Sequence, residues 1–168
     1  TGIRIRGINS QSTNVTINGI PYNDAESLGT FWVDLPDFSS SIENLQVQRG
    51  IGTSVNGSSA FGASINILTD KISEKSFFES SNTVGSFNTV KNNFKFSTGL
   101  LNNAFEFSGR LSKIDSDGYI DRAFSDLKSY YIQLTYKKNK TLLKFINFGG
   151  QEITYQAWNG IDLLTLEN

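Results

Sequence analysis

Residues 105–112 read Phe105-Glu106-Phe107-Ser108-Gly109-Arg110-Leu111-Ser112, a stretch in which apolar and polar side chains largely alternate. A period of two places these two kinds of side chain on opposite faces of a β-strand. The same alternation runs through residues 90–97 and 130–137. Each segment is close to the ~9–11 residues that a tilted strand needs to cross a bilayer. The pattern predicts an open antiparallel meander, the start of a transmembrane β-barrel, and an ordinary antiparallel sandwich is the alternative.

If the meander spans a membrane, one face meets lipid and the other meets a wet interior. The expected lipid face carries Phe94, Phe96, Phe105, Phe107, Leu111, Tyr130, Ile132, Leu134 and Tyr136. The expected interior face carries Lys91, Lys95, Glu106, Arg110, Gln133 and Lys137. A fifth segment, residues 141–148, has apolar groups on both faces and is ambiguous. Five strands cannot close, so we expect two unpaired edges and an isolated chain that needs detergent.

The composition argues against several classes of function. Of the 168 residues, 38% are apolar and only 18% are charged, while Phe occurs 13 times. A net charge of −1 provides no basic field, so we expect no nucleic-acid partner. The chain has no His and no Cys, which removes imidazole-based triads and thiolate metal sites. We therefore expect no enzyme activity, no catalytic residues, no cofactor and no bound metal. The chain has no Met either, and we expect a piece of a longer protein.

The first part of the chain has a different texture, with short β segments between loops rich in Gly, Ser and Asn. We expect a compact mixed sheet with strands at Ile3–Arg6, Val15–Ile17, Ile42–Val47 and Ile65–Leu68. Pro21 and Pro36 lie in the irregular stretch between the second and third of these strands, where a missing N–H costs least.

Three motifs in this part stand in a characteristic order. The first consists of Arg4-Ile5-Arg6-Gly7, a short loop and Val15-Thr16-Ile17-Asn18-Gly19-Ile20-Pro21. The second is Ile42-Glu43-Asn44-Leu45-Gln46-Val47-Gln48-Arg49-Gly50, and the third is the stretch from Gly57 to Ile67. This order resembles the plug domain of TonB-dependent outer-membrane receptors. Asn18 stands where that family usually has Asp, and Ile51 where it often has Pro. The stretch from Tyr155 to Gly160 is similar to receptors of Bacteroidetes-type bacteria.

The resemblance implies two domains, with residues 1–70 as the C-terminal part of a plug and residues 71–168 as the first barrel strands and loops. It implies energised import across the outer membrane of a Gram-negative bacterium, most often of an iron–siderophore complex. Cobalamin, haem, a peptide or a glycan are alternative cargoes, and a β-sheet cell-surface adhesion module is the alternative function. The expected partners are TonB, through an N-terminal segment outside this chain, the small-molecule ligand and outer-membrane lipid.

Two groups of residues are candidate functional sites. Following the strand directions, the segment Tyr22–Val33 becomes an outward-facing apex, which in this family contacts the ligand. The ligand-binding candidates combine aromatic and polar side chains and are Tyr22, Asn23, Glu26, Phe31, Trp32, Tyr155 and Trp158. The alternative is that Phe31 and Trp32 only pack the plug against its wall. Enclosed charges need partners, so Glu43 is expected to pair with Arg6 or Arg49, or these arginines with barrel carboxylates.

A cluster of acidic residues in a long loop is a candidate metal site. Asp115, Asp117, Asp121 and Asp126 surround Gly118 and suggest calcium. Their spacing misses the calcium-loop pattern, because Tyr119 stands where another oxygen ligand belongs. We expect a solvated outer loop.

Overall fold

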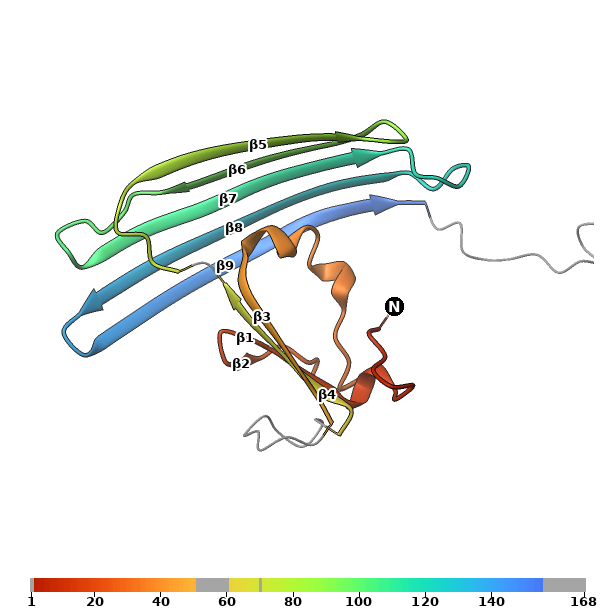
Figure 1. Ribbon diagram of the computed structural model, residues 1–168, viewed down its shortest axis with the longest axis horizontal. Coiled ribbons are helices and arrows are strands. Elements are labelled where there is room, and N and C mark those ends of the chain that lie inside the picture. Colours follow the sequence, from red (N-terminus) through yellow and green to blue (C-terminus); the bar gives the residue numbers. More distant parts are fainter. Residues whose placement is uncertain (1, 51–60, 70, 156–168) are drawn as a thin grey trace, which may run out of the picture.

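The computed structural model describes residues 2–50, 61–69 and 71–155, and the other positions are left aside. Two sheets make up the fold (Figure 1). The four-stranded N-terminal sheet has the order β2-β1-β4-β3 and the five-stranded meander has the order β5-β6-β7-β8-β9. This architecture confirms the predicted fold class, mainly β with a mixed sheet followed by an open antiparallel meander. Within the described ranges, no helix is long and apolar enough to cross a membrane.

The N-terminal sheet is built from β1 (Thr13–Ile17), β2 (Ile20–Pro21), β3 (Ile42–Arg49) and β4 (Ala63–Thr69). β1 and β4 are parallel, with Val15 opposite Ile65, whereas β3 runs antiparallel to β4. Three short 3-10 helices complete this part, η1 (Ser10–Ser12), η2 (Trp32–Asp34) and η3 (Phe38–Ser41).

The predicted strand Ile3–Arg6 is wrong. Ile5 forms only an isolated bridge with Ile8, and its carbonyl accepts the Ile8 N–H at 3.1 Å. The chain folds back here because Arg6 and Gly7 both have positive φ, 54° and 76°. Two successive residues in this region make a tight turn, which glycine allows at no steric cost. The other three predicted strands are confirmed.

The meander consists of β5 (Phe77–Gly85), β6 (Thr89–Ser97), β7 (Phe105–Ser116), β8 (Ser125–Lys138) and β9 (Thr141–Thr154). Every neighbouring pair is antiparallel, and the two outer strands, β5 and β9, each have one edge without a partner strand among the described residues. The loop between β7 and β8 covers residues 117–124, because the two strands stay paired out to Ser116 and Ser125.

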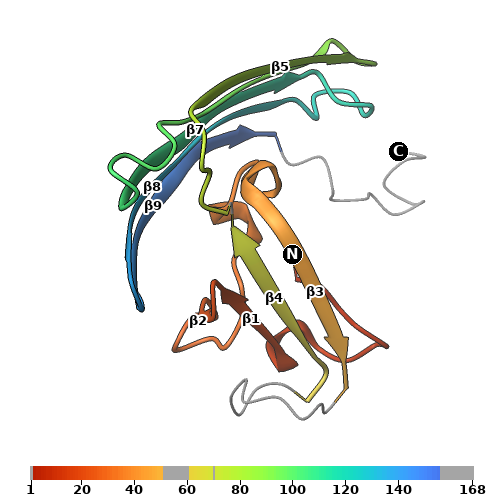
Figure 2. The same ribbon diagram turned by 60° about the vertical axis from the view of Figure 1, so that its left-hand side comes forward.

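The meander is curved, and the N-terminal sheet lies against its concave side (Figure 2). We call this concave side the inner face and the opposite side the outer face. The register places Arg110 opposite Tyr131 and Tyr131 opposite Phe148 on the inner face. It places Leu111 opposite Tyr130 on the outer face. The predicted division between an apolar and a polar face of the strands is therefore confirmed.

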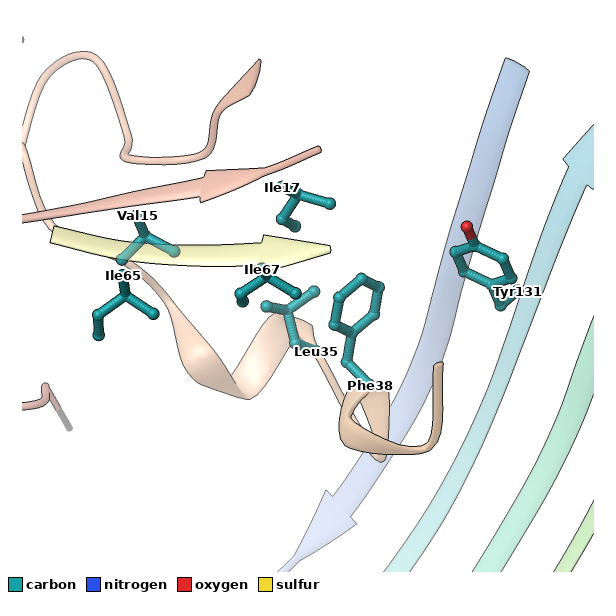
Figure 3. Close-up of a cluster of buried hydrophobic side chains, with 7 residues drawn as sticks. All are labelled: Val15, Ile17, Leu35, Phe38, Ile65, Ile67 and Tyr131. Atoms are coloured by element: carbon teal, nitrogen blue, oxygen red, sulfur yellow. The ribbon is translucent and has the colours of Figure 1, made fainter. Parts of the chain in front are cut away.

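One hydrophobic core joins the two sheets. The N-terminal sheet contributes Val15, Ile17, Ile65 and Ile67, and the loop region between β2 and β3 contributes Leu35 and Phe38. Phe38 reaches from η3 toward Tyr131 on β8 (Figure 3), with ring centroids 6.3 Å apart. The ambiguous strand β9 is explained by this core, because Ile146 and Phe148 pack against it from the inner face.

Candidate functional site

The contact between η3 and the inner face is the most strongly built polar feature among the described residues. Its centre is Asp37, which precedes η3 and has a left-handed backbone with φ 49°. We call the cluster the Asp37 junction; its members are Asp37, Ser40 and Ser41 from the N-terminal region and Lys91, Arg110 and Ser112 from β6 and β7. Residues 37–41 thus meet residues more than fifty positions later in the chain.

Both carboxylate oxygens of Asp37 are used. Oδ1 accepts from Lys91 Nζ at 2.6 Å and from Ser40 Oγ at 2.8 Å. Oδ2 accepts from Arg110 Nη1 at 3.1 Å and from Ser112 Oγ. Arg110 also donates through Nε to Ser41 Oγ at 2.7 Å. The junction therefore forms a closed network across the boundary between the two sheets.

The junction is buried. The Asp37 and Arg110 side chains are 4% and 1% exposed, and Ser41 is fully buried. Burial by itself raises the pKa of Asp37, but hydrogen bonds from Lys91, Ser112 and Ser40 outweigh it and lower the pKa below the ordinary value. Asp37 is therefore ionised at neutral pH and keeps both cations paired.

A second contact runs through hydroxyl and amide groups. The Tyr131 hydroxyl lies 2.8 Å from Thr69 Oγ1 and 2.9 Å from Gln133 Oε1. Thr69 also accepts from Asn18 Nδ2 at 2.8 Å, and its own N–H donates to Asn18 Oδ1 at 3.0 Å. A chain of polar groups thus links the β1–β2 turn to β8. Hydrogen-bonded networks of this kind fix a buried arrangement because each lost partner leaves an unsatisfied group.

A third contact fixes the segment between β4 and β5. Glu106 Oε1 on β7 accepts from the Ser73 N–H at 2.9 Å and from Ser97 Oγ at 2.7 Å. Glu106 is 2% exposed. Its position on the inner face agrees with the predicted interior set, in which Lys91, Arg110 and Gln133 also make the contacts described above.

The predicted ion-pair residues are not brought together. Glu43 Oε1 pairs with Lys71 Nζ at 2.6 Å on the surface, and this contact is the main reason that the pKa of Glu43 is lowered. Arg6 lies in the turn after Ile5 and Arg49 ends β3, and neither forms an ion pair with the described residues. The ion pairs between the N-terminal region and the meander are instead those of Asp37 with Lys91 and Arg110.

The candidate ligand residues divide into packed and exposed groups. Tyr22 is partly buried with its ring 6.3 Å from that of Phe148, and burial raises its pKa, with Asp34 adding to the effect. Asn23 accepts from the Val15 N–H at 2.7 Å and donates to the carbonyls of Thr13 and Leu28 at 2.9 and 2.8 Å. Trp32 packs against the core. Packing and internal hydrogen bonds therefore account for these three side chains, at positions where we expected ligand contacts.

The exposed candidates are Glu26, Phe31 and Tyr155. Phe31 is 52% exposed and Tyr155 is 47% exposed, with Arg122 5.6 Å above the Tyr155 ring. Val33 and Asp34 border a hollow that also touches Glu152 and Thr154 at the end of β9. Val33 and Asp34 therefore lie toward the same rim as the 117–124 loop. Trp158 lies outside the described residues.

Sequence reasoning missed Asp37. The signal was weak, an acidic residue directly after Pro36 and before Phe38-Ser39-Ser40-Ser41 in a region treated as irregular. Among the described residues, no group of three or more His, Cys, Asp or Glu is arranged to hold a metal ion. Asp115 instead pairs with Lys113 at 2.9 Å.

A small mixed sheet held on the concave side of a meander defines a class of protein, the plugged β-barrel. Residues 1–64 match the TonB-dependent Receptor Plug Domain family. Comparison with curated protein sequences found no match. Residues 1–64 are thus similar to the plug of TonB-dependent receptors, and the meander that follows shares its fold with the adjacent barrel region of the solved receptors below.

Solved structures share this fold at low sequence identity. The pyoverdine outer membrane receptor FpvA from Pseudomonas aeruginosa PAO1 is 19% identical with a TM-score of 0.64, over 80% of this chain and 20% of that one. The siderophore receptor PirA from Acinetobacter baumannii is 19% identical with a TM-score of 0.62, over 89% and 25%. The ferric citrate transporter FecA is 19% identical with a TM-score of 0.60, over 86% and 24%.

The chain spans about a fifth to a quarter of the length of these receptors. The outer-membrane localisation predicted from the sequence agrees with these relatives, and the plug-domain match agrees with a protein that is not an enzyme. The comparisons do not bear on the predicted bacterial group.

Proposed function

We propose that this chain is part of a receptor that imports an iron–siderophore complex across the outer membrane with energy delivered by TonB. The observation that carries the proposal is the plug-type sheet seated on the concave side of the meander through the Asp37 junction. A domain in this position obstructs the interior of a barrel. Import then requires that the obstruction be held at rest and displaced when energy is supplied.

The contacts between the two sheets suit such a cycle. The Asp37 junction consists of charged and hydroxyl groups, and water can replace each of these partners when the interface opens. The apolar part of the interface is centred on Phe38, Tyr131 and Phe148. The polar part costs less to hydrate than the apolar part, because apolar surface returned to water costs about 25 cal/mol per Å².

The choice of cargo rests on similarity of fold. Two of the structures described above are named as siderophore or pyoverdine receptors and one as a ferric citrate transporter. Two exposed aromatic residues, Phe31 in the apex and Tyr155 after β9, provide rigid apolar surfaces suited to packing against a bulky chelate. Cobalamin, haem, a peptide or a glycan are the other outcomes of a cargo screen.

The proposal is tested by uptake of radioactive iron in a strain lacking the receptor. Cells expressing the intact receptor should accumulate iron from one ferric siderophore of a panel, and deletion of TonB should abolish this uptake. Uptake that persists without TonB would contradict the energised mechanism. Surface adhesion without uptake of any cargo in the panel would instead support the adhesion module.

A substitution at Phe31 tests whether the segment Tyr22–Val33 contacts the ligand. Phe31→Ala should weaken binding of the imported complex without blocking membrane insertion, because Phe31 is half exposed and is not part of the hydrophobic core. The matched control is Phe61→Ala, which removes another exposed phenylalanine, 68% exposed, next to β4. Equal affinity in the two variants and the wild type would show that Phe31 does not contact the ligand.

A further inference from the structure

The outer face of the meander changes character toward the rim that carries the 117–124 loop. Along β7, Phe105, Phe107 and Leu111 are exposed apolar residues, and the next outer-face residues are Lys113 and then Asp115. On β8 the same order runs from Leu134 and Tyr130 to Lys128 and Asp126. The apolar band therefore ends at a pair of lysines that lie directly opposite each other.

A groove lies at this boundary. It has a volume of about 540 Å³ and is lined by the apolar side chains of Phe94, Leu111 and Tyr130, with Lys113 and Lys128 also in its lining. On β9 the residue opposite Tyr130 is Gly149, and the Tyr130 ring lies over it and forms one wall of the groove. The groove is thus largely apolar, and its lining includes the two lysines that border the band.

The charges at this boundary are arranged in two rows. Lys113 faces Lys128, and Asp115 faces Asp126 one step further from the apolar band. Like charges directly opposite each other on neighbouring strands are unfavourable. Lys113 Nζ lies 2.9 Å from Asp115 Oδ2, and Lys128 Nζ lies 3.7 Å from Asp126 Oδ2. The lysine side chains are still 48% and 54% exposed, and each ammonium has three donors.

We propose that this groove binds a phosphorylated lipid, with an acyl chain against Phe94, Leu111 and Tyr130 and the phosphate between Lys113 and Lys128. A phosphate placed there would accept hydrogen bonds from both ammonium groups and remove their mutual repulsion. The apolar lining accounts for the acyl chain and the lysine pair accounts for the anionic head group. The inference rests on the membrane placement contained in the proposed function, and it does not depend on the cargo.

The test is native mass spectrometry of the intact receptor in a non-ionic detergent, with equal amounts of dioleoyl phosphatidic acid and dioleoyl phosphatidylcholine. Two lysines near one phosphate should favour phosphatidic acid by about tenfold or more. The double variant K113Q/K128Q should lose this preference. The control K138Q/K140Q removes the same charge at the opposite rim, where both lysines flank the β8–β9 turn, and should keep it.

A third variant, Leu111→Ala, removes part of the apolar lining without changing charge and should reduce retention of both lipids. The proposal is overturned if K113Q/K128Q keeps the wild-type preference, or if K138Q/K140Q loses it equally. The first result would mean that the lysines only extend their charged ends into water. A receptor that retains phosphatidic acid selectively but imports no iron complex would contradict the proposed cargo and leave the lipid site standing.

Discussion

The two faces of β7 show how one strand serves two environments. Arg110 on the inner face is 1% exposed, whereas its neighbour Leu111 on the outer face is 57% exposed. In a water-soluble protein the usual arrangement is the reverse, with the leucine inside and the arginine outside. Here the buried face is polar because the N-terminal sheet covers it with Asp37 and Ser41. The exposed face is apolar because its proposed neighbour is lipid.

The alternation of a strand determines which side chains lie on the same face. The groups packed against that face determine whether it is polar or apolar, and β9 shows this as well. Its inner-face residues Ile146 and Phe148 are apolar because they meet the hydrophobic core beside Phe38, while Arg110 two strands away meets a carboxylate. The inner face is therefore apolar where it meets the hydrophobic core and polar where it meets Asp37.

The largest expected effect comes from removing the charged partner of Arg110 and Lys91 on the inner face. Asp37→Ala leaves Arg110 and Lys91 without their shared carboxylate, and removing one partner of a buried ion pair costs about 3–5 kcal/mol. We expect faster hydrogen exchange of the amides of residues 38–41 in the intact receptor and a lower free energy of unfolding. Asp34→Ala is the control, since Asp34 is exposed and outside the junction. Equal exchange in the two variants would contradict a stabilising role for the Asp37 junction.

The next effect tests the outer face. Leu134 is 48% exposed in the middle of the apolar band, and an arginine near the bilayer midplane costs about 2–4 kcal/mol in a membrane barrel. We expect Leu134→Arg to lower the urea concentration at which the receptor unfolds from lipid vesicles. The control Gln151→Arg lies beside Lys128 at the edge of the band and should have little effect. A soluble sandwich predicts no difference between these two sites.

A smaller effect sharpens the contrast between adjacent residues of β8. Tyr131→Phe removes the hydroxyl next to Thr69 and Gln133 in a buried site, and the expected loss is about 1 kcal/mol. Tyr130→Phe removes the hydroxyl of an outer-face tyrosine that is 38% exposed, and we expect almost no change. The comparison is made by chemical denaturation of the two variants side by side. An equal effect would show that the Thr69–Tyr131 contact does not hold the sheets together.

The smallest effect concerns pH. The pKa of Asp37 is lowered in the folded protein, so its contribution is complete above its unfolded pKa of about 4 and is lost as the pH falls through the folded value. Between pH 5 and 8 we therefore expect no change in the protection of the amides of residues 38–41, measured as the exchange rate relative to the intrinsic rate at each pH. Below about pH 4 this protection should fall, and Asp37→Asn should remove that acid-dependent step. An onset near pH 6 would point to a different titrating group.

Much of the fold could be predicted because its signals are local. The alternation in β6, β7 and β8 identified both faces, and the Gly and Asn turns separated the strands. The parallel pairing of β1 with β4 could not be predicted, because Val15 and Ile65 are partners in the sheet but lie 50 residues apart in the sequence (65 − 15). The segment Ile3–Arg6 was wrongly predicted as a strand because its sequence alternates. The backbone reverses direction at Arg6 and Gly7.

The candidate site was harder to predict than the fold. Lys91 and Arg110 were correctly placed on the interior face, since their position follows from the period of two. Their partner was not identified, because Asp37 lies in an irregular segment where no periodicity indicates direction. The roles of Tyr22, Asn23 and Trp32 were also not visible, since packing against Phe148 and the hydrogen bonds of Asn23 depend on how the loop closes.

The most direct test of the central claim, that the inner face meets the N-terminal sheet and the outer face meets lipid, is a spin-label accessibility measurement. The chain contains no Cys, so single cysteines can be introduced at Leu111 and Leu134 on the outer face and at Ser108 and Ser129 on the inner face. In the receptor reconstituted in lipid, we predict that the outer labels collide with oxygen and not with a water-soluble nickel chelate, while the inner labels are protected from both. Outer labels that collide freely with the nickel chelate would contradict the account.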